Sequence, residues 1–352
     1  MPGNPDYRVI RIPKKSGGVR VIHAPLPALK TKQESLLKIL SGLRIRRGPW
    51  VNAYLPRTRG SIKTAAERLL LSVDGKTRSP DCLLKMDIAD YFSNCTEDLV
   101  VKALEYESVE QWIIDLVRDR CFIFDGKGRR VLPQGAPTSP FLAALVMKGV
   151  AARINGVVKE WDRLNHCPCT FVTYSDNLSF GCDDPSMVRL VYPVRHVLKK
   201  IGFEVNERKI EFHRKPARFV VCGVQINDKI GPRRPYWRVL RAELHNALTD
   251  RRADIAPAGF YLEDKTRQEL RRIAGINGKP GLVKALPQDA LNFLARNQAC
   301  TRAIPWATWK GKIGFVAFLD PKRGRDLQAI YDELEAETRC KSARSSSTPT
   351  RP

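Results

Sequence analysis

Two aspartates that lie far apart in the chain each follow a short apolar segment. Asp87 ends the segment Leu83–Asp87. Asp176 lies in a polar turn between the segments Thr170–Tyr174 and Leu178–Cys182, which together predict a β-hairpin. If the first segment is a strand beside this hairpin, the two carboxylates meet at one edge of a sheet. Paired carboxylates bind hard divalent cations such as Mg²⁺, and two such ions activate an attacking hydroxyl and stabilise a leaving phosphate group. For either aspartate alone, ordinary turn chemistry is the simpler interpretation.

The most specific string in the chain lies between these two segments. Leu132–Pro140 contains a Gln-Gly pair flanked by prolines and leads into a helix predicted from about 141 to 161. Gly135 allows the backbone to approach a bound strand closely, and Ser139 or Pro140 is suited to begin the helix. A loop of this kind is common as a plain connection. Its position between the two carboxylate segments favours a role at the same site.

The elements that must position these residues can be predicted from periodicity and turn residues. Alternating segments over Arg8–Ile12 and Val19–Ile22, joined by a Lys-Ser-Gly-Gly turn, predict a basic hairpin. Leucines at helical spacing follow over residues 28–43. A break at Gly231–Pro235 ends the central region, and helical segments are predicted after it to about residue 338.

The charge of the chain indicates a polyanionic partner. The 352 residues carry a formal net charge of +24, with 43% hydrophobic and 28% charged residues, so the composition is that of a folded protein. Residues 1–70 hold 15 Lys and Arg against 3 Asp and Glu, and residues 231–352 hold 23 against 13. Residues 71–230 are nearly neutral, with 23 against 21. Two basic flanks around a neutral centre favour a nucleic acid as the partner, ahead of an anionic membrane.

Cysteine usage and hydropathy predict a cytosolic protein. The nine cysteines are scattered through apolar segments, which is typical of free thiols in a reducing compartment. The string His166–Cys169 has a spacing that matches no usual structural zinc site. We find no stretch of the roughly 20 apolar residues that a membrane span needs, and Met1–Ile12 has no apolar signal core. The sequence therefore predicts no membrane partner.

Six segments, in their order along the chain, resemble the motifs of reverse transcriptases. They correspond to a fingers hairpin, a first aspartate strand, a Gln-Gly loop, a Tyr-X-Asp-Asp hairpin, a further palm motif and a Val-X-Gly strand. The segments are Ile12–Arg20, Asp87–Phe92, Leu132–Pro140, Tyr174–Asn177, Gly202–Lys209 and Val220–Val224. Within this family the chain is similar to the bacterial retron-type enzymes. The resemblance implies an α+β, right-hand polymerase architecture with fingers, a palm with an antiparallel sheet, and a helical thumb.

The same resemblance implies a domain organisation. Residues 1–80 would form the fingers, with the basic hairpin and helices, and residues 81–230 the palm that holds the catalytic carboxylates. Residues 231–340 would form an RNA-binding thumb. The Ser-, Thr- and Pro-rich segment 341–352 is expected to be a disordered tail.

The resemblance also implies individual site residues. The catalytic residues would be Asp87, Asp176, Asn177 and Lys209, the last as the acid that protonates the leaving pyrophosphate. Two Mg²⁺ ions would be bound by Asp87, Asp176 and the backbone carbonyl of Ile88. Nucleotide-binding residues would be Lys14, Arg20, Phe92, Gln134 and Gly135, with Phe92 as the aromatic side chain that excludes a ribose 2′-OH.

Arginines and aromatic residues alternate at the start of the predicted thumb. Such a mixture suits phosphate contacts and base stacking on structured RNA, and retron enzymes bind their own RNA through the thumb. The alternative for the aromatic residues is a packed helix face. The predicted RNA-binding residues are Arg233, Arg234, Tyr236, Trp237, Arg238 and Arg241.

The chain departs from the family pattern in two places. Retron enzymes usually carry an Asn-Ala-X-X-His element before the Gln-Gly loop, and residues 93–131 do not contain one. The hairpin ends in Asn177 instead of a second aspartate, so the site has one carboxylate fewer. We expect activity to survive with a weaker or altered metal preference that shifts toward Mn²⁺.

The resemblance implies the RNA-directed DNA polymerase of a retron, in the bacterial cytoplasm. It would copy a structured non-coding RNA from a 2′-OH primer in that RNA and yield multicopy single-stranded DNA joined to the RNA. Its partners would be this RNA, the RNA–DNA product, dNTPs and a separate effector protein in anti-phage defence. Two alternatives stay open. One is a catalytically weak or inactive homologue that serves as an RNA-binding scaffold, which Asn177 favours. The other is an abortive-infection or intron-derived reverse transcriptase.

Overall fold

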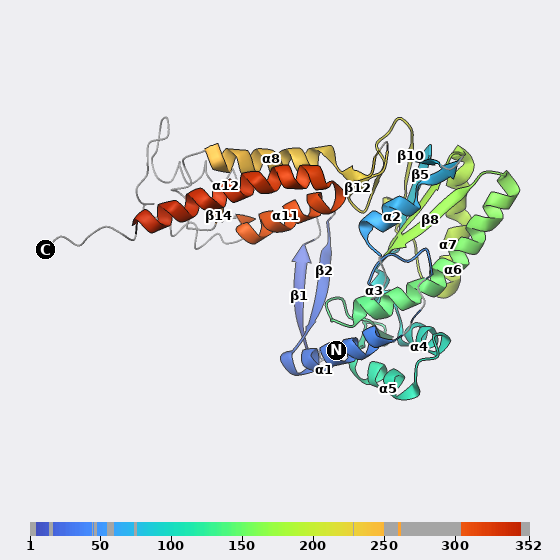
Figure 1. The fold of residues 1–352 in the computed structure, drawn as a ribbon. Helices are drawn as coiled ribbons and strands as arrows, with labels where there is room; N and C mark the ends of the chain where they lie inside the picture. The colour runs from blue at the N-terminus through green and yellow to red at the C-terminus, as the bar shows by residue number, and fades with distance from the viewer. Residues whose placement is uncertain are drawn as a thin grey trace. The chain divides into compact units, whose positions relative to one another are not determined.

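The chain divides into two compact units, Met1–Ile230 (unit 1) and Gly231–Pro352 (unit 2), shown in Figure 1. The structure is a computed structural model and describes residues 5–13, 17–43, 45, 48–54, 60–73, 76–227, 229–249, 260–261 and 304–345. Lys14, one of the predicted nucleotide-binding residues, lies outside the described residues.

Unit 1 combines helices with short antiparallel sheets. Its helices are α1 (Pro27–Gly42), α2 (Ile62–Arg68), α3 (Tyr91–Asn94), α4 (Glu97–Tyr106), α5 (Gln111–Arg120), α6 (Ser139–Asn165) and α7 (Val191–Ile201), with 3-10 helices η1 (Pro185–Leu190) and η2 (Glu207–Lys209). Its strands are β1 (Tyr7–Pro13), β2 (Val19–Pro25), β3 (Leu71–Val73), β4 (Lys76–Arg78), β5 (Cys82–Asp87), β6 (Ile123–Phe124), β7 (Arg130–Val131), β8 (Cys169–Tyr174), β9 (Asn177–Cys182), β10 (Glu211–Arg214), β11 (Val220–Val221) and β12 (Val224–Gln225).

The centre of unit 1 is a four-stranded antiparallel sheet in the order β10-β5-β9-β8. The predicted aspartate strand therefore does lie beside the predicted hairpin, with Asp87 directly opposite Asn177. Five of the six residues of β5 are buried, so this strand has an almost continuous apolar character. Phe171 and Phe180, which face each other across β8 and β9, stack with ring centroids 4.9 Å apart.

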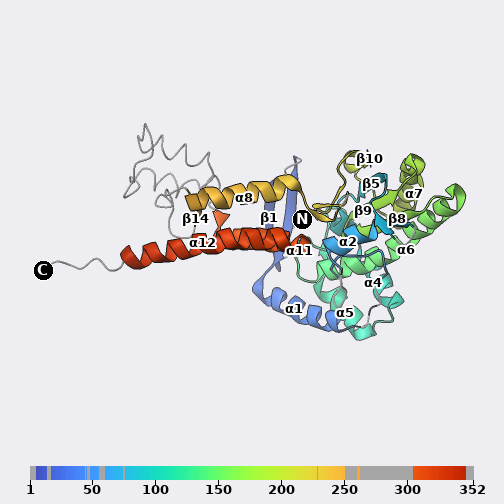
Figure 2. The same cartoon turned by 45° about the horizontal axis from the view of Figure 1, so that its top comes forward.

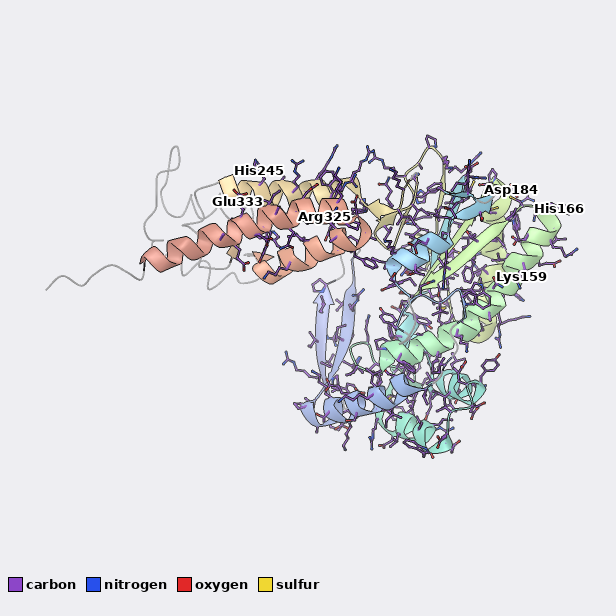
Figure 3. The ribbon with its side chains drawn as sticks, viewed as in Figure 1. Lys159, His166, Asp184, His245, Arg325 and Glu333 are labelled. Atoms are coloured by element: carbon purple, nitrogen blue, oxygen red, sulfur yellow. The ribbon has the colours of Figure 1, made fainter. Side chains whose placement is uncertain are left out.

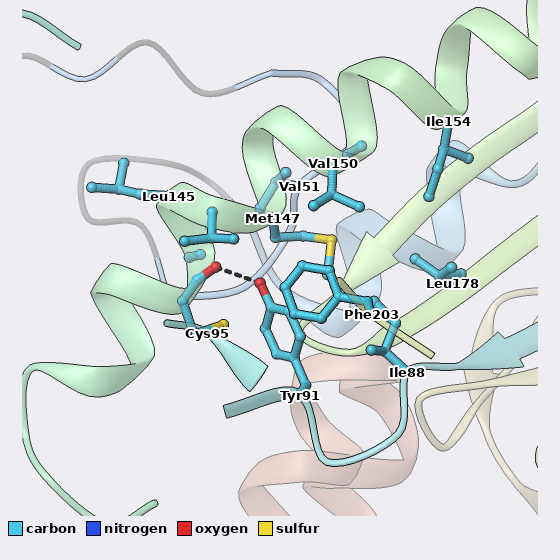
Figure 4. Packing of buried hydrophobic residues seen from close by; sticks show 14 of the residues in the cluster. Val51, Ile88, Tyr91, Cys95, Leu145, Met147, Val150, Ile154, Leu178 and Phe203 are labelled. Carbon is cyan, nitrogen blue, oxygen red and sulfur yellow. Dashed lines mark hydrogen bonds between the residues drawn. The ribbon is translucent and has the colours of Figure 1, made fainter. Parts of the chain in front are cut away.

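Helix α6 is the core helix of unit 1. It lies along β8 in Figures 1 and 2, and twelve of its residues are buried, including Met147 and Ile154. Figure 4 shows these side chains around Tyr91, whose hydroxyl donates to the carbonyl of Ala143 at 2.6 Å. Burial of each large apolar side chain contributes roughly 1.5–3 kcal/mol, so α6 holds the sheet and the neighbouring helices together.

Hydropathy alone makes α6 a candidate membrane span, contrary to the sequence analysis. The helix has 27 residues and an 18-residue window with a mean hydropathy of 1.6. However, 61% of that window is buried inside the protein, which is how the core helix of a globular unit behaves. The helix also begins two residues earlier and ends four later than predicted, with Thr138 as its N-cap residue and Pro140 in its first turn.

The basic hairpin forms as predicted. β1 and β2 pair over seven residues, and the turn between them requires positive φ at Gly17 (+84°) and Gly18 (+81°). Glycine adopts this left-handed region without steric cost, which explains the Gly-Gly sequence. The backbone N–H of His23 in β2 donates to the carbonyl of Gln134 at 2.7 Å. The hairpin is therefore joined to the Gln-Gly loop.

Unit 2 contains three long helices that lie side by side in both views of Figures 1 and 2. They are α8 (Arg234–Thr249), α11 (Trp306–Leu319) and α12 (Pro321–Ser345), accompanied by the short strands β13 (Gly231–Pro232), β14 (Phe260–Tyr261) and β15 (Ile304–Pro305). Leu240, Leu244, Trp309 and Tyr331 are among the residues of its hydrophobic core.

The disordered tail was predicted to begin at residue 341, which is too early in the chain. α12 continues through residues 341–345, which we expected to be disordered. This segment reads Lys-Ser-Ala-Arg-Ser, and Lys, Ala and Arg are favourable helix residues, so an existing helix extends through it. The predicted part from 346 to 352 lies outside the described residues.

Candidate active site

A cleft of about 790 Å³ in unit 1 collects most of the residues that the sequence analysis selected as catalytic, metal-binding or nucleotide-binding. These residues come from the hairpin, the end of β5, helix α3, the Gln-Gly loop, the β8–β9 turn and the segment after α7. They are Arg20, Asp87, Ile88, Phe92, Gln134, Asp176 and Lys209. Segments that are up to about 190 residues apart in the sequence thus contribute to one site.

Backbone hydrogen bonds to two neighbouring segments hold Asp87 in place at the end of β5. The residue is only 6% exposed, although its side chain is a carboxylate. Its backbone carbonyl accepts from the N–H of Asn206 at 2.8 Å, and the N–H of the next residue, Ile88, donates to the carbonyl of Asp176 at 3.1 Å. Buried carboxylates are rare unless paired or bound to a metal, so this position indicates a functional carboxylate.

Asp176 lies at the tip of the β8–β9 hairpin, in a two-residue turn in which Ser175 has a φ of +57°. Burial and the neighbouring charge of Asp87 raise the pKa of the Asp176 carboxyl, while Lys209 opposes this shift. The two carboxylates line the same cleft, and the N–H of Ile88, next to Asp87, donates to the carbonyl of Asp176. The structure brings together the pair on which the sequence analysis depended.

Lys209 is the cation nearest to this pair. Its Nζ lies 2.9 Å from Oδ2 of Asp87, at the end of the 3-10 helix η2. The lysine side chain is about half exposed, and the carboxylate is almost buried. Lys209 can therefore contact Asp87 and also face a group that occupies the cleft.

Asn177 is not among the residues that line the main cleft, although it lies next to them. It is exposed and lines a small neighbouring pocket of about 100 Å³, which shares Asp87 and Lys209 with the main cleft. Its side-chain amide donates to Oδ1 of Asp176 at 3.1 Å. An aspartate could not make this bond in its ionised form and would add a negative charge beside Asp176.

The Gln-Gly loop has a structural reason for its glycine. Gly135 has a φ of +116°, and a Cβ there would lie 2.6 Å from Cγ2 of Ile22 and 3.2 Å from the carbonyl oxygen of His23. Gly135 thus allows close approach of the protein's own strand β2, whereas the sequence analysis expected a bound strand. Gln134 lines the cleft beside it. A nucleotide contact by either residue stays a prediction.

Phe92 of α3 and Arg20 of β2 both line the cleft. Phe92 is partly buried in α3, with its ring 5.9 Å from that of Tyr91 in an edge-to-face arrangement. Arg20 is exposed on β2. An aromatic side chain and a cation of the hairpin therefore line the same cavity.

Sequence reasoning missed several polar residues of this cleft. Arg208 lines it next to Lys209, and Asn206 holds the backbone of Asp87. The signal was present in the string Asn-Glu-Arg-Lys, which we interpreted through its lysine alone. Asp90 also lines the cleft and has a φ of +42°.

The predicted RNA-binding residues lie at the start of unit 2 and differ in exposure. Arg234, Arg238 and Arg241 are exposed on α8 at spacings of four and three residues, so they share one face. Trp237 instead packs against the hydrophobic core of unit 2, with the guanidinium of Arg323 4.8 Å from its ring centroid. For Trp237 the packed-face alternative holds, and the structure gives it a packing role.

The remaining two residues of this set are exposed. Arg233 precedes α8, and its carbonyl accepts from the N–H of Tyr236 at 3.0 Å. The ring of Tyr236 stands edge-to-face with Phe315 at 5.3 Å, and burial raises the pKa of its phenol. Tyr236 has one ring edge in a packed contact and 38% of its surface exposed.

The donor set of the cleft fits hard divalent cations. Asp87 and Asp176 offer carboxylate oxygens, and Ile88 lies between them. Within the described part of the chain, no group of three or more His, Cys, Asp and Glu side chains is arranged to hold a metal. Mg²⁺ is commonly bound by one or two carboxylates together with substrate phosphates and water, so two carboxylates are sufficient.

Comparison with known proteins identifies the class to which this fold and cleft belong. Residues 12–226 match the family model described as reverse transcriptase (RNA-dependent DNA polymerase). This match covers more than half of the chain, and the chain belongs to the reverse transcriptase family. The predicted α+β, right-hand polymerase fold is confirmed by this membership.

Curated relatives confirm the predicted resemblance to retron enzymes. The chain is 30% identical over 256 residues to the retron Mx65 reverse transcriptase of Myxococcus xanthus, a match that covers 68% of this chain and 55% of that protein. It is 28% identical over 241 residues to the retron Ec83 reverse transcriptase of Escherichia coli, covering 63% and 69%. The retron Ec73 reverse transcriptase of E. coli is 26% identical over 303 residues, covering 76% and 89%. The chain thus spans just over half the length of the Mx65 protein.

Proposed function

We propose that this protein is an RNA-directed DNA polymerase that extends a primer on an RNA template with deoxynucleotides. The observation that carries the proposal is the meeting of Asp87 and Asp176 at one end of a cleft that Gln134, Phe92 and cations also line. In this proposal residues 1–80 are the fingers, 81–230 the palm and 231–340 the thumb.

The carboxylates of Asp87 and Asp176, with the carbonyl of Ile88, would hold two divalent ions, which we propose to be Mg²⁺. When bound, such ions lower the pKa of the attacking hydroxyl and neutralise the leaving pyrophosphate. The chain fixes the two carboxylates before any ligand arrives, because hydrogen bonds from Asn206 and Ile88 join β5 to its neighbours. Such preorganisation avoids reorganisation during the reaction.

The other side chains of the cleft bind and orient the incoming nucleotide. Arg20 and Arg208 reach the cleft from two elements and would grip the triphosphate oxygens. Lys209, already beside Asp87, would give a proton to the leaving pyrophosphate. Phe92 would exclude a ribose 2′-OH, and Gln134 would contact the nucleotide or the template.

Relatives that are retron reverse transcriptases support a retron biology for this chain. We propose that its template is a structured non-coding RNA and that synthesis starts from a 2′-OH of that RNA. The product would be multicopy single-stranded DNA joined to the RNA, made in the bacterial cytoplasm. A separate effector protein would use this complex in anti-phage defence.

Sequencing the nucleic acid that co-purifies with the full chain tests this proposal. A branched RNA–DNA molecule is expected. RNA without DNA would support the scaffold alternative that Asn177 favours. DNA that is unlinked or attached to protein would instead support an abortive-infection or intron-derived enzyme. Either of these two results would overturn the retron proposal.

Asn177→Asp is expected to improve primer extension in Mg²⁺. The substitution places a third carboxylate beside Asp176 and removes the amide that now donates to it at 3.1 Å. The added charge favours binding of hard cations. If it contributes about 1.4 kcal/mol of binding free energy, the Mg²⁺ concentration needed should fall by about 10-fold. The measurement is the Mg²⁺ concentration that gives half-maximal extension, compared with the same titration in Mn²⁺.

Asn177→Ala is the matched control for this experiment, because it removes the amide and adds no charge. We expect it to leave the half-maximal Mg²⁺ concentration within about 2-fold of the unsubstituted chain, which is the size of a lost exposed hydrogen bond. An Asn177→Asp variant that is no better in Mg²⁺ would remove the idea that Asn177 alters the metal preference.

Binding of structured RNA is expected to weaken steeply with salt. Four exposed arginines at the start of unit 2 would each neutralise a phosphate, so the slope of log affinity against log salt should be about −3. Replacing Arg238 and Arg241 together by glutamine should reduce the magnitude of this slope by roughly 1 to 2. Fluorescence anisotropy with a labelled hairpin RNA over a salt series measures both quantities.

Arg163→Gln provides the control for the RNA experiment. Arg163 is an exposed arginine of unit 1, paired with Glu160 on α6, and no part of the proposed RNA surface. Its replacement should leave the slope unchanged. A nearly flat salt dependence of the unsubstituted chain would contradict the proposed RNA surface.

A further inference from the structure

Cys167, Cys169 and Cys182 gather at the end of the central sheet that lies farthest from the carboxylates, where the buried Cys82 of β5 also lies directly opposite Cys182. Cys169 begins β8 and is directly opposite Cys182, the last residue of β9. Cys167 lies two residues before β8. Figure 3 labels His166 and Asp184, the neighbours of this cluster, at one end of unit 1. From Cys182 to the start of β9 at Asn177 the strand covers roughly 17 Å.

Two sulfur atoms of this cluster, those of Cys167 and Cys182, are within hydrogen-bonding distance of each other. Sγ of Cys167 lies 3.4 Å from Sγ of Cys182, and the backbone N–H of Asp184 donates to the same Cys182 sulfur at 3.4 Å. A disulfide requires a separation of about 2.05 Å, so the first pair needs an approach of little more than an ångström. The cysteines described by the structure are all free thiols.

The hydrogen bonds concentrate negative charge on one sulfur. The thiol of Cys169, the Asp184 N–H and the thiol of Cys167 lower the pKa of Cys182 to about 6 against the opposing effect of burial. Burial, first, and the adjacent Cys182 raise the pKa of Cys167. These contacts favour the thiolate form of Cys182, whereas Cys167 and Cys169 hold their protons more strongly than a free thiol does.

Access from solvent differs between the three thiols. Cys182 has no exposed surface and Cys169 is 8% exposed, whereas Cys167 is half-buried and can be reached by a small molecule. Transfer of the proton along the Cys167–Cys182 hydrogen bond moves the thiolate to the accessible sulfur. Cys167 can thus act as the accessible nucleophile. The buried Cys182 lies within reach of any mixed disulfide that forms on Cys167.

We propose that Cys167 and Cys182 form a dithiol modification site for low-molecular-weight disulfides. The Cys167 thiolate attacks one sulfur of the small disulfide, its S–S bond breaks, and one small thiolate leaves. Cys182, after giving up the shared proton, attacks the Cys167 sulfur and displaces the second small thiol. One protein disulfide forms, the small disulfide is reduced to two small thiols, and the shared proton ends on one of them.

A metal site is the competing interpretation of a cysteine cluster, and the geometry does not support it. No group of three or more His, Cys, Asp and Glu side chains in the described ranges is arranged to hold a metal ion. The proposal is also independent of the polymerase function, because the cluster shares no residue with the carboxylate cleft.

The test exposes the purified full chain to glutathione disulfide in the presence of a chelator, blocks free thiols, and identifies linked peptides by mass spectrometry without reduction. The expected main product is the peptide pair joined through Cys167 and Cys182. In the Cys182→Ala variant, one glutathione should remain on Cys167 because the second thiol is missing. In Cys167→Ser, modification of Cys182 should fall by at least about 10-fold, because the accessible thiol is lost.

Two controls separate this site from general thiol reactivity. Cys169→Ala should preserve the Cys167–Cys182 link, because Cys169 only donates a hydrogen bond. Cys222 is half-buried as well, and burial raises its pKa to about 11, so it should take up less glutathione than Cys167. Each variant is checked for an unchanged circular dichroism spectrum before the assay.

Three results would each overturn the proposal. The first is an unsubstituted chain that carries glutathione on Cys167 without forming the link. The second is a dominant link between Cys169 and Cys182. The third is stoichiometric zinc in the purified protein that protects the cluster from glutathione disulfide.

Discussion

Replacing Asp87 by asparagine is expected to lower the rate of primer extension by more than about 100-fold, because changes in groups that merely support a metal ligand already cost about 10- to 100-fold. Asp87 is 6% exposed and is paired with Lys209 at 2.9 Å, so the neutral amide also leaves that lysine without its carboxylate partner. Single-nucleotide extension of a DNA primer on an RNA template measures the rate. Binding of Mn²⁺ followed by electron paramagnetic resonance gives a second readout.

Asp98→Asn is the control for this experiment. Asp98 is an exposed carboxylate in the first turn of α4 and lies outside the cleft, so its replacement should leave both extension and Mn²⁺ binding unchanged. Asp176→Asn should match Asp87→Asn in both readouts. Full extension by either cleft variant would show that the two carboxylates do not hold the catalytic ions.

Phe92→Ala is expected to reduce the preference for deoxynucleotides over ribonucleotides by about 10- to 200-fold, the range that one steric contact in a pocket supplies. The ring of Phe92 lines the cleft and is fixed by its edge-to-face contact with Tyr91. Removing it opens the space into which a ribose 2′-OH would project. The measurement is kcat/KM for dGTP and GTP on the same primer and template.

A graded pair of variants controls for loss of folding. Phe92→Leu retains most of the bulk and should change the preference much less than Phe92→Ala. Phe124→Ala removes an aromatic ring that is 66% exposed on β6 and outside the cleft, and it should leave the preference unchanged. If Phe92→Ala lowers kcat/KM for both nucleotides equally, Phe92 acts in packing and does not select the sugar.

The elements that carry the carboxylates could be predicted from local signals. The apolar run before Asp87 and the polar tip at Asp176 predicted β5 and the β8–β9 hairpin, and the sheet pairs them as expected. The Gly-Gly turn of β1–β2 was equally clear, because the two positions need positive φ. In each case one short stretch of sequence determines the geometry.

Features that depend on tertiary contacts could not be predicted in this way. The place of Asn177 in a small pocket beside the main cleft depends on its register opposite Asp87 and on residues of β10 that complete the pocket. The packed position of Trp237 depends on Arg323, which is 86 residues away. The role of Gly135 depends on the path of β2. None of these contacts leaves a local pattern.

The bond between His23 and Gln134 has a mechanical consequence for the proposed site. Because β2 carries Arg20 and is held against the Gln-Gly loop by this bond and by the close approach at Gly135, a movement of the hairpin would shift the carbonyl of Gln134 with it. If Arg20 binds the triphosphate as proposed, that binding would therefore be coupled through the backbone of β2 to the position of the loop that carries Gln134.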